Sequence, residues 1–293
     1  MVEWIKNVTL PESQPEITLR EQMRAWRMPK RIQGQLRQQK RVLVNQAYHN
    51  VETVLQAGDV VTMHFVESDF VTPISSYVPD IRETIDVLFE NDDLLVVNKR
   101  SGLKTHPNSP FEDGTLMNYV QGYLALNAHE NAYMVHRLDV ATSGAILVAK
   151  NPMAVTLLNA YLRDKTIQRY YVARVAGQME GASGTIRLPI GCDPEHPRQR
   201  MVNGSNSQPA VTHWKVSETR ADSSLVAIAL ETGRTHQIRV HLAAVGHPIL
   251  GDTLYYPADT GSERLMLHGE KIVFINPYSH TEIVVNAPTP TGF

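Results

Sequence analysis

The sequence holds a single cysteine, Cys192, among its 293 residues. One cysteine excludes a disulfide within the chain and a zinc site built on several cysteines, and it is typical of a reducing cytosol. No apolar run reaches the roughly 18 residues that a membrane span requires. The N-terminal residues, with Glu3 and Lys6 among scattered apolar side chains, lack the apolar core of a secretory signal. We therefore expect a cytoplasmic protein with no membrane partner.

The sequence also lacks a charge excess and the common cofactor motifs. Its 28 basic residues face 30 acidic ones, so the net charge of −2 gives no overall signature of nucleic-acid binding, and such binding must use a local patch. Neither the glycine pattern G-x-G-x-x-G nor the phosphate loop G-x-x-x-x-G-K-[ST] occurs. The length allows one large domain and a small one.

The N-terminal region predicts two short helices after an irregular start. Residues 1–16 hold two prolines and no clear period, so we expect an extended or poorly ordered arm there. Thr18 is a plausible N-cap for the first helix, and Pro29 ends it. The apolar side chains at helical spacing are Leu19, Met23 and Trp26 in the first helix and Ile32 and Leu36 in the second.

These two helices carry the local basic patch. Between Arg20 and Arg41 there are eight basic residues and one acidic residue, Glu21. A basic face can simply be solvated, but an excess that continues through two helices favours contact with phosphate groups. The residues predicted to make such contacts are Arg20, Arg24, Arg27, Lys30, Arg31 and Arg37.

Short apolar runs at residues 42–44 and 60–65, the second preceded by a Gly58-Asp59 turn, predict strands after the helices. With this order of elements, residues 17–66 resemble the S4 RNA-binding module, although residues 46–50 lack its usual glycine. The resemblance implies recognition of structured RNA through shape and backbone. Residues 67–81, with little periodicity, predict a linker to the second domain.

Residues 134–150 read "MVHRLDVATSGAILVAK" and hold the most unusual pattern of the chain. The apolar, β-branched residues 145–149 predict a buried strand. Directly before them come His136, Arg137 and Asp139, although an aspartate is seldom buried without a partner. From the residues alone, two interpretations stay open: Asp139 caps a turn beside a surface Arg137, or the two belong to a functional site.

Two further segments decide between these interpretations. Residues 169–175 read "RYYVARV", and residues 230–241 read "LETGRTHQIRVH". Together with "HRLD" they resemble the RluA-type pseudouridine synthases, over residues 85–290. This implies that residues 82–293 form an α+β catalytic domain whose mixed, largely antiparallel central sheet is flanked by helices. The chain departs from the family pattern at Arg100, where a proline is usual, and at Ser207 and Gln208, where a Gly-Lys pair is usual.

The resemblance also implies roles for single residues. Asp139 is the catalytic carboxylate, and Arg234 is its ion-pair partner, which would keep the carboxylate charged in a closed site. Tyr171 is the active-site tyrosine, with Tyr170 on the opposite face of the strand as its competitor. Arg137 would fill the stack that a flipped uridine leaves. Leu267 is expected to help floor the base pocket.

The implied reaction converts uridine to pseudouridine in RNA, and because it has no redox or phosphoryl step we expect no cofactor. Asp139 could act as a nucleophile or as a base, and both routes stay open. The expected partner is structured RNA, with ribosomal RNA favoured and transfer RNA possible, and no obligate protein partner is evident.

Four alternative interpretations of the chain or of single residues are weighed against this one. The chain could be a catalytically silent RNA-binding protein on the same fold. A glycoside hydrolase would want a second acid beside Asp139. A metal site at His236 and His241 is disfavoured, because their spacing of five does not place them on one helix face. Lys99 could cap a strand or meet a phosphate.

Overall fold

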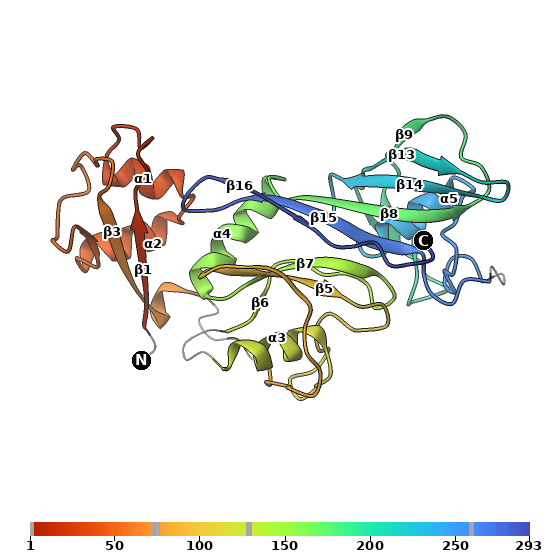
Figure 1. Cartoon of the computed structure of the whole chain (residues 1–293), viewed down its shortest axis with the longest axis horizontal. Helices are drawn as coiled ribbons and strands as arrows, with labels where there is room; N and C mark the ends of the chain where they lie inside the picture. The colour runs from red at the N-terminus through yellow and green to blue at the C-terminus, as the bar shows by residue number, and fades with distance from the viewer. Residues whose placement is uncertain (1–2, 72–74, 76, 127–130, 258–260) are drawn as a thin grey trace.

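The computed structural model describes residues 3–71, 75, 77–126, 131–257 and 261–293. Its main feature is a large sheet with strand order β4-β5-β7-β15-β8-β14-β13-β9, to which β16 adds beside β15 and β6 beside β7 (Figure 1). All its pairings are antiparallel except β7 with β15. The α+β class and the mixed, largely antiparallel sheet predicted from the sequence are confirmed. The strands are β4 (Val87–Glu90), β5 (Leu94–Lys99), β6 (Tyr133–Met134), β7 (Ser143–Ala149), β8 (Gln168–Ala176), β9 (Ser183–Ile186), β13 (Thr212–Thr219), β14 (Ser223–Leu230), β15 (Leu267–Ile275) and β16 (Glu282–Asn286).

Helices cover both faces of the sheet, which explains why its central strands read as continuous apolar runs. In β7, Ile146 and Val148 pack into the core that includes α3 (Leu116–Leu124) and α5 (Gln237–Ala244). Their neighbour Leu147 packs into the opposite core with α4 (Pro152–Arg163). All seven residues of β7 are buried, as predicted for residues 145–149. A separate small sheet of β10 (Ile190–Cys192), β11 (Arg200–Val202) and β12 (Ser205–Gln208) lies after β9.

A close approach of two backbones fixes the start of β7. Gly144 pairs with Gly269 of β15 in the parallel register. A Cβ atom at Gly144 would lie 2.2 Å from the Gly269 carbonyl oxygen, and the backbone φ of +119° is one that side chains rarely adopt. The "TSG" part of the sequence pattern thus lets the turn at residues 139–142 sit directly over β15 and β8.

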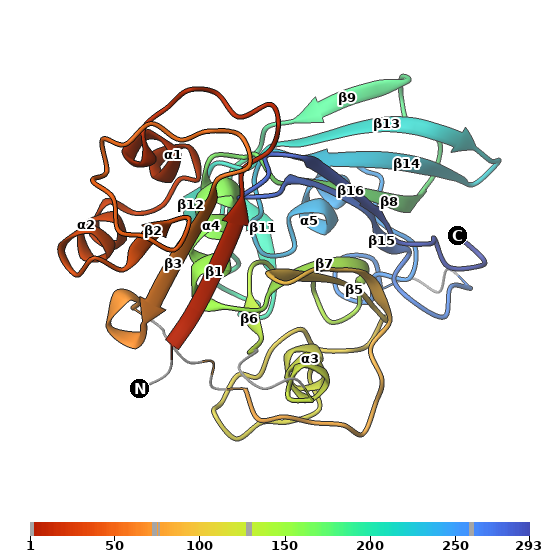
Figure 2. The same ribbon diagram turned by 60° about the vertical axis from the view of Figure 1, so that its left-hand side comes forward.

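The N-terminal residues form a second, smaller unit with its own sheet, of order β1-β3-β2, and two helices (Figure 2). The two predicted helices are present, and Thr18 caps the first in a capping box with Glu21. The elements are β1 (Glu3–Thr9), α1 (Leu19–Ala25), α2 (Lys30–Gln38), β2 (Val42–Val44), β3 (Val60–Val66) and the 3₁₀ turn η1 (Glu67–Asp69).

Two boundaries of this unit differ from the prediction. The supposed arm of residues 1–16 contains β1, which pairs with β3 from Glu3 to Thr9. The start of the supposed linker, residues 67–81, also belongs to the unit. Asp69 is 1% exposed and accepts two hydrogen bonds from the Arg41 guanidinium at 2.7 and 2.8 Å, and Phe70 packs into the same core. Part of the predicted linker, residues 72–74 and 76, lies outside the described residues.

The two units share a core. Trp26 at the end of α1 is 0% exposed, and its indole Nε1 donates to the Tyr278 carbonyl at 3.1 Å. Met153 and Leu157 of α4 lie in the same apolar cluster. Lys6 of β1 pairs with Asp93 at 2.5 Å, and Arg27 pairs with Asp164 at the end of α4. These contacts hold the N-terminal unit against the larger one.

Candidate active site

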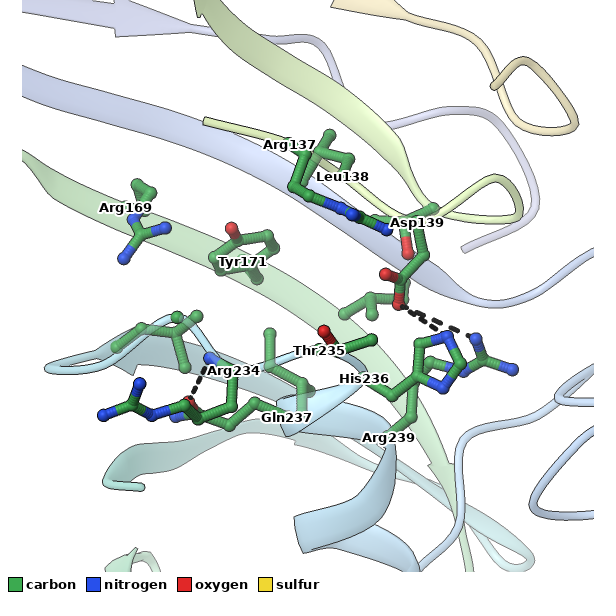
Figure 3. Close-up of a pocket in the computed structure, with 15 residues that line it drawn as sticks. Arg137, Leu138, Asp139, Arg169, Tyr171, Arg234, Thr235, His236, Gln237 and Arg239 are labelled. Atoms are coloured by element: carbon green, nitrogen blue, oxygen red, sulfur yellow. Dashed lines mark hydrogen bonds and ion pairs between the residues drawn. The ribbon is translucent and has the colours of Figure 1, made fainter. Parts of the chain in front are cut away.

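The three sequence motifs meet in one pocket, as predicted. The turn before β7 supplies Asp139, β8 supplies Tyr171, and the segment that leads into α5 supplies Arg234 (Figure 3). Leu267 at the start of β15 also lines this pocket, as expected for a floor residue. The remaining lining residues are Arg137, Leu138, Thr142, Arg169, Leu230, Gly233, Thr235, His236, Gln237, Ile238 and Arg239.

The backbone around Asp139 is held by the loop that follows β5. Ser101 Oγ donates to the Ala141 carbonyl at 2.7 Å, and Thr105 Oγ1 donates to the Leu138 carbonyl at 2.6 Å. The Gly102 amide donates to the Val140 carbonyl at 2.9 Å. Because carbonyls on both sides of Asp139 are bonded to a second segment, the carboxylate starts from a fixed position.

Lys99 also bonds the turn around Asp139. This favours a structural role for Lys99 over contact with a phosphate. The side chain is 0% exposed, and its Nζ donates to the carbonyls of Val140 at 3.0 Å and Leu103 at 2.7 Å. Lys99 therefore ties the end of β5 to the Asp139 turn and is not exposed to a phosphate. The neighbouring Arg100, which replaces the family proline, is exposed and pairs with Glu83 outside the pocket.

The burial of the Lys99 amine leads to a testable prediction about the pH dependence of stability. Burial lowers the pKa of Lys99 from 10.5 to about 7, against an opposing effect of Asp139. Between these values the unfolded chain binds more protons than the folded one. Lys99 therefore adds to the free energy of unfolding as the pH rises from about 7 to 10.5, by at most about 1.4 kcal/mol per pH unit.

Urea titrations at several pH values in this window should show that rise in the wild type and a flatter curve in Lys99→Met. Equal pH dependence in both proteins would contradict the prediction. Below the lower pKa, the two curves should run parallel, because lysine is then protonated in both states.

The ion-pair partner of Asp139 differs from the prediction. Arg239 Nη1 lies 3.6 Å from Asp139 Oδ2, and the same guanidinium binds Asp252 with two hydrogen bonds of 2.7 and 2.8 Å. Arg234 lines the pocket but is exposed, and its Nε donates to the Pro209 carbonyl at 3.0 Å. The reason is local: α5 begins at Gln237, so Arg239 lies in its buried first turn while Arg234 precedes the helix.

Tyr171, and not Tyr170, faces the pocket. Tyr171 is 5% exposed and its ring packs beside Gly269, and burial raises the pKa of its hydroxyl. Tyr170 lies on the other face of β8, where Lys271 Nζ sits 4.3 Å from its ring centroid. The alternation of the strand thus separates the two tyrosines as expected.

The pocket rim is rich in arginine. Arg137 is exposed there, beside Asp139. Arg169 lies against the backbone of Gly233, where a Cβ atom would come within 2.9 Å of its guanidinium. Among the described lining residues, Arg137, Arg169 and Arg234 add three guanidinium groups to that of Arg239, which pairs with Asp139. Such an edge attracts anions.

The two histidines considered for metal binding have different surroundings. His241 is buried and its ring nitrogens bond Thr212 Oγ1 at 2.9 Å and the Leu188 carbonyl at 2.8 Å. His236 lines the pocket, with Nε2 at 4.0 Å from Asp139 Oδ2. Within the described parts of the chain, no group of three or more His, Cys, Asp or Glu side chains could hold a metal ion.

The predicted phosphate contacts of the N-terminal unit fall into two sets. Four of them border a shared hollow between α1 and α2. The other two make contacts within the protein at its surface: Arg27 pairs with Asp164, and Arg31 donates to the carbonyls of Ser68 and Asp69. Arg20 of the first set pairs with Glu52. The four at the hollow are Arg20, Arg24, Lys30 and Arg37.

Comparison with known proteins identifies the family. Residues 93–244, more than half of the chain, match the model of the RNA pseudouridylate synthase family. The chain belongs to this family. Its members isomerise uridine to pseudouridine in RNA. Residues 6–61 match the model of the RluD ribosomal pseudouridine synthase N-terminal domain, which includes most of β1 and agrees with its place in the N-terminal sheet.

Named relatives of this synthase are bacterial. An uncharacterized RNA pseudouridine synthase, YhcT of Bacillus subtilis, is 42% identical over 81% of this chain and 78% of its own. The ribosomal large subunit pseudouridine synthase C of Vibrio cholerae is 34% identical over 89% of this chain and 85% of its own. The dual-specificity RNA pseudouridine synthase RluA of Vibrio vulnificus is 37% identical over 70% of this chain and 83% of its own length.

A solved structure supports the same fold. The human RNA pseudouridylate synthase domain containing 1 aligns with a TM-score of 0.61 and 28% identity, over 72% of this chain and 86% of its own. Among the described helices of the present synthase, none is long and apolar enough to cross a membrane.

The two arginines of the last motif now make contrasting predictions. In Arg239→Gln, the nearly fully buried Asp252 loses its charged partner, so the free energy of unfolding should fall by about 3–5 kcal/mol. In Arg234→Gln, an exposed side chain is changed, and the loss should stay within about 0.5 kcal/mol. Chemical denaturation of both variants tests this. Similar losses in the two variants would mean that the pairing seen here is not the one that holds the site.

Proposed function

We propose that this synthase isomerises specific uridines of structured ribosomal RNA and that Asp139 is its catalytic carboxylate. The supporting observation is the placement of Asp139. Its backbone is fixed by the loop after β5, its Oδ2 atom lies near Arg239 and His236, and it faces the buried Tyr171 across one pocket. Among the described residues that line the pocket, Asp139 is the only carboxylate, and Arg137, Arg169, Arg234 and Arg239 surround it with positive charge.

The reaction breaks the bond from uracil N1 to ribose C1′ and forms a bond from C5 to C1′, after which C5 loses its proton and N1 gains one. Asp139 must be ionised to act as nucleophile or as base. The Arg239 guanidinium lies beside that carboxylate, with Nη1 3.6 Å from Oδ2, and forms an ion pair with it. Tyr171 packs against the flipped uracil. Since burial raises the pKa of its hydroxyl, this group keeps its proton at neutral pH.

A uridine in a helix must be flipped out to reach this pocket. Arg137, exposed at the rim and two residues before Asp139, is in place to enter the vacated stack. Arg169 and Arg234 line the same pocket and can meet the flanking phosphates.

Ribosomal RNA is favoured over transfer RNA for two reasons. Two relatives carry names that refer to the large ribosomal subunit, those of Vibrio cholerae and Nitrosomonas europaea. The N-terminal unit, S4-like in its order of elements, presents Arg20, Arg24, Lys30 and Arg37 around one hollow. Such a unit suits a large folded RNA recognised by shape. The proposal places this synthase in the cytoplasm, and the isomerisation, which has no redox or phosphoryl step, calls for no cofactor or obligate protein partner.

Turnover of defined transcripts tests the substrate. Transcripts of the large- and small-subunit ribosomal RNAs and a transfer RNA pool of the source organism would carry tritium at uracil C5, which the reaction releases. We expect release from a ribosomal transcript at the level of one or a few sites per molecule. Release from transfer RNA alone would overturn the ribosomal assignment. Binding without release from any transcript would favour the catalytically silent RNA-binding protein.

The N-terminal hollow makes a separate prediction. Combined substitution Arg24→Gln, Lys30→Gln and Arg37→Gln should weaken binding to all RNA sequences alike and reduce the salt dependence of binding by about one ion per lost contact. The matched control is Arg220→Gln, an exposed arginine on the turn after β13. Filter binding over a salt series measures both. An unchanged slope in the triple variant would mean that these residues form a merely solvated face.

A further inference from the structure

A chain of hydrogen bonds leads from the small sheet of β10 to β12 to the pocket. The backbone amide of Arg200 in β11 donates to the Tyr255 hydroxyl at 2.8 Å. That hydroxyl lies 2.8 Å from His236 Nδ1. On the other side of the imidazole ring, Nε2 lies 4.0 Å from Asp139 Oδ2. His236 belongs to the motif of residues 232–237, but no pattern in the sequence connects it with Tyr255.

This series of hydrogen bonds selects one tautomer of His236. A backbone amide can only donate, so Tyr255 accepts from Arg200 and directs its own proton to His236 Nδ1. Nδ1 is then an acceptor, and the ring proton resides on Nε2. The carboxylate that faces Nε2 favours the same arrangement, because an acceptor lone pair there would oppose the charge of Asp139. Both ends of the ring therefore specify a neutral histidine with an Nε2–H group.

The position of His236 is fixed in other ways too. It precedes α5 with a left-handed backbone, φ of 57°, and its ring packs edge-on to Tyr255 with centroids 5.7 Å apart. Tyr255 also lies under the Arg239 guanidinium, 5.1 Å from its ring centroid. The charged groups that face His236 are Asp139, Arg239, Arg200 and Asp252. Burial lowers the pKa of His236, against the effect of Asp139, which favours the neutral ring.

His236 and Arg239 both approach the same oxygen of the Asp139 carboxylate. Arg239 Nη1 lies 3.6 Å and His236 Nε2 lies 4.0 Å from Asp139 Oδ2 (Figure 3). These distances exceed those of a hydrogen bond, and contacts of this kind tighten when the reactant binds. With Oδ2 held from two sides, Oδ1 is the atom left to meet the reacting sugar.

We infer that His236 is a positioning residue which donates from Nε2 to Asp139 Oδ2 and so presents Oδ1 to the substrate, and that Tyr255 fixes the tautomer that allows this. The inference rests on the proposed role of Asp139 and adds two residues to it. It predicts that Tyr255 acts on the reaction only through His236.

The tautomer is measured without catalysis. Nitrogen-15 correlation spectra of the imidazole rings, in the intact protein, report which nitrogen of His236 carries the proton, with His236→Gln used to assign the signal. We expect Nε2–H in the wild type and a mixture of both tautomers in Tyr255→Phe. A wild-type ring protonated on Nδ1 would overturn the inference, whatever the activity of the enzyme.

Kinetics test the consequence, with a matched pair of amides at position 236. The nitrogen of glutamine can take the place of Nε2, while asparagine reaches only the place of Nδ1. We expect kcat to fall less in His236→Gln than in His236→Asn. In His236→Asn and in Tyr255→Phe, kcat should each be lowered about 10-fold, the effect of one hydrogen bond to a charged group. KM should change little in all three.

The double variant separates a positioning role from a structural one. If Tyr255 acts through the tautomer of His236, adding Tyr255→Phe to His236→Gln should have no further effect on kcat, because the amide has no tautomer to fix. Equal losses in both backgrounds would overturn the inference and leave Tyr255 as packing for Arg239. If wild type releases no tritium from any transcript, the proposed function fails instead, and the spectra still decide the tautomer.

Discussion

Replacing Asp139 by asparagine is expected to reduce pseudouridine formation by at least about 10⁴-fold, the scale at which removal of a nucleophile or its partner acts in other enzymes. Asparagine has the same shape, but it can neither attack the sugar nor accept its proton. The backbone of the turn is held by Ser101, Gly102 and Thr105, which the substitution leaves in place. The loss should therefore concern chemistry and not folding.

RNA binding supplies the internal control for this variant. With one negative charge removed from a pocket lined by Arg137, Arg169 and Arg234, affinity for RNA should be equal or slightly higher. Asp222→Asn, at an exposed carboxylate outside the pocket, should keep both binding and turnover. Single-turnover rates and binding isotherms on the same transcript measure the two properties. Residual turnover within about 100-fold of wild type would point to another group as the reactive one.

Replacing Trp26 by alanine should lower the free energy of unfolding by about 3–5 kcal/mol, the range for a fully buried tryptophan. The indole is 0% exposed, bonds the Tyr278 carbonyl and packs in one cluster with Met153 and Leu157 of α4. Because this cluster joins the two units, the N-terminal unit of the variant should unfold before the larger one. Urea unfolding followed by circular dichroism should then show two transitions in place of one.

The variant Trp26→Phe separates packing from the hydrogen bond. Phenylalanine keeps most of the buried ring surface and loses only the bond to Tyr278, so a loss of about 1–2 kcal/mol is expected. A single transition with an unchanged midpoint in Trp26→Ala would show that the two units are not joined through this core. In that case the N-terminal unit would move freely relative to the pocket.

Local patterns predicted much of this fold. The N-cap at Thr18 and the buried run of β7 depend on neighbours in the sequence, and local patterns predict both. Strand β1 was missed because its alternation of Trp4 and Val8 is interrupted at Lys6. Lys6 is stabilised there by contacts far along the chain, with Asp93 and with the ring of Tyr278. A contact of that kind is not visible in a local pattern.

In the site, too, some features follow from local sequence patterns and others depend on the tertiary structure. The motifs gave Asp139, Tyr171 and the segment that holds the arginine partner. They do not identify the arginine that pairs with Asp139. Arg234 and Arg239 lie five residues apart, and the choice depends on where α5 begins. The buried first turn of that helix places Arg239 between Asp252 and Asp139, a geometry that requires the tertiary structure.

The central claim, that this synthase modifies ribosomal uridines through Asp139, is tested most directly by mapping pseudouridine in cellular RNA. Total RNA would come from a strain lacking the gene, and from the same strain supplied with the wild type or with Asp139→Asn at equal protein levels. We predict that one or a few ribosomal positions lose pseudouridine in the deletion strain and that only the wild type restores them. Restoration by Asp139→Asn, or no change at any ribosomal position in the deletion strain, would contradict the account.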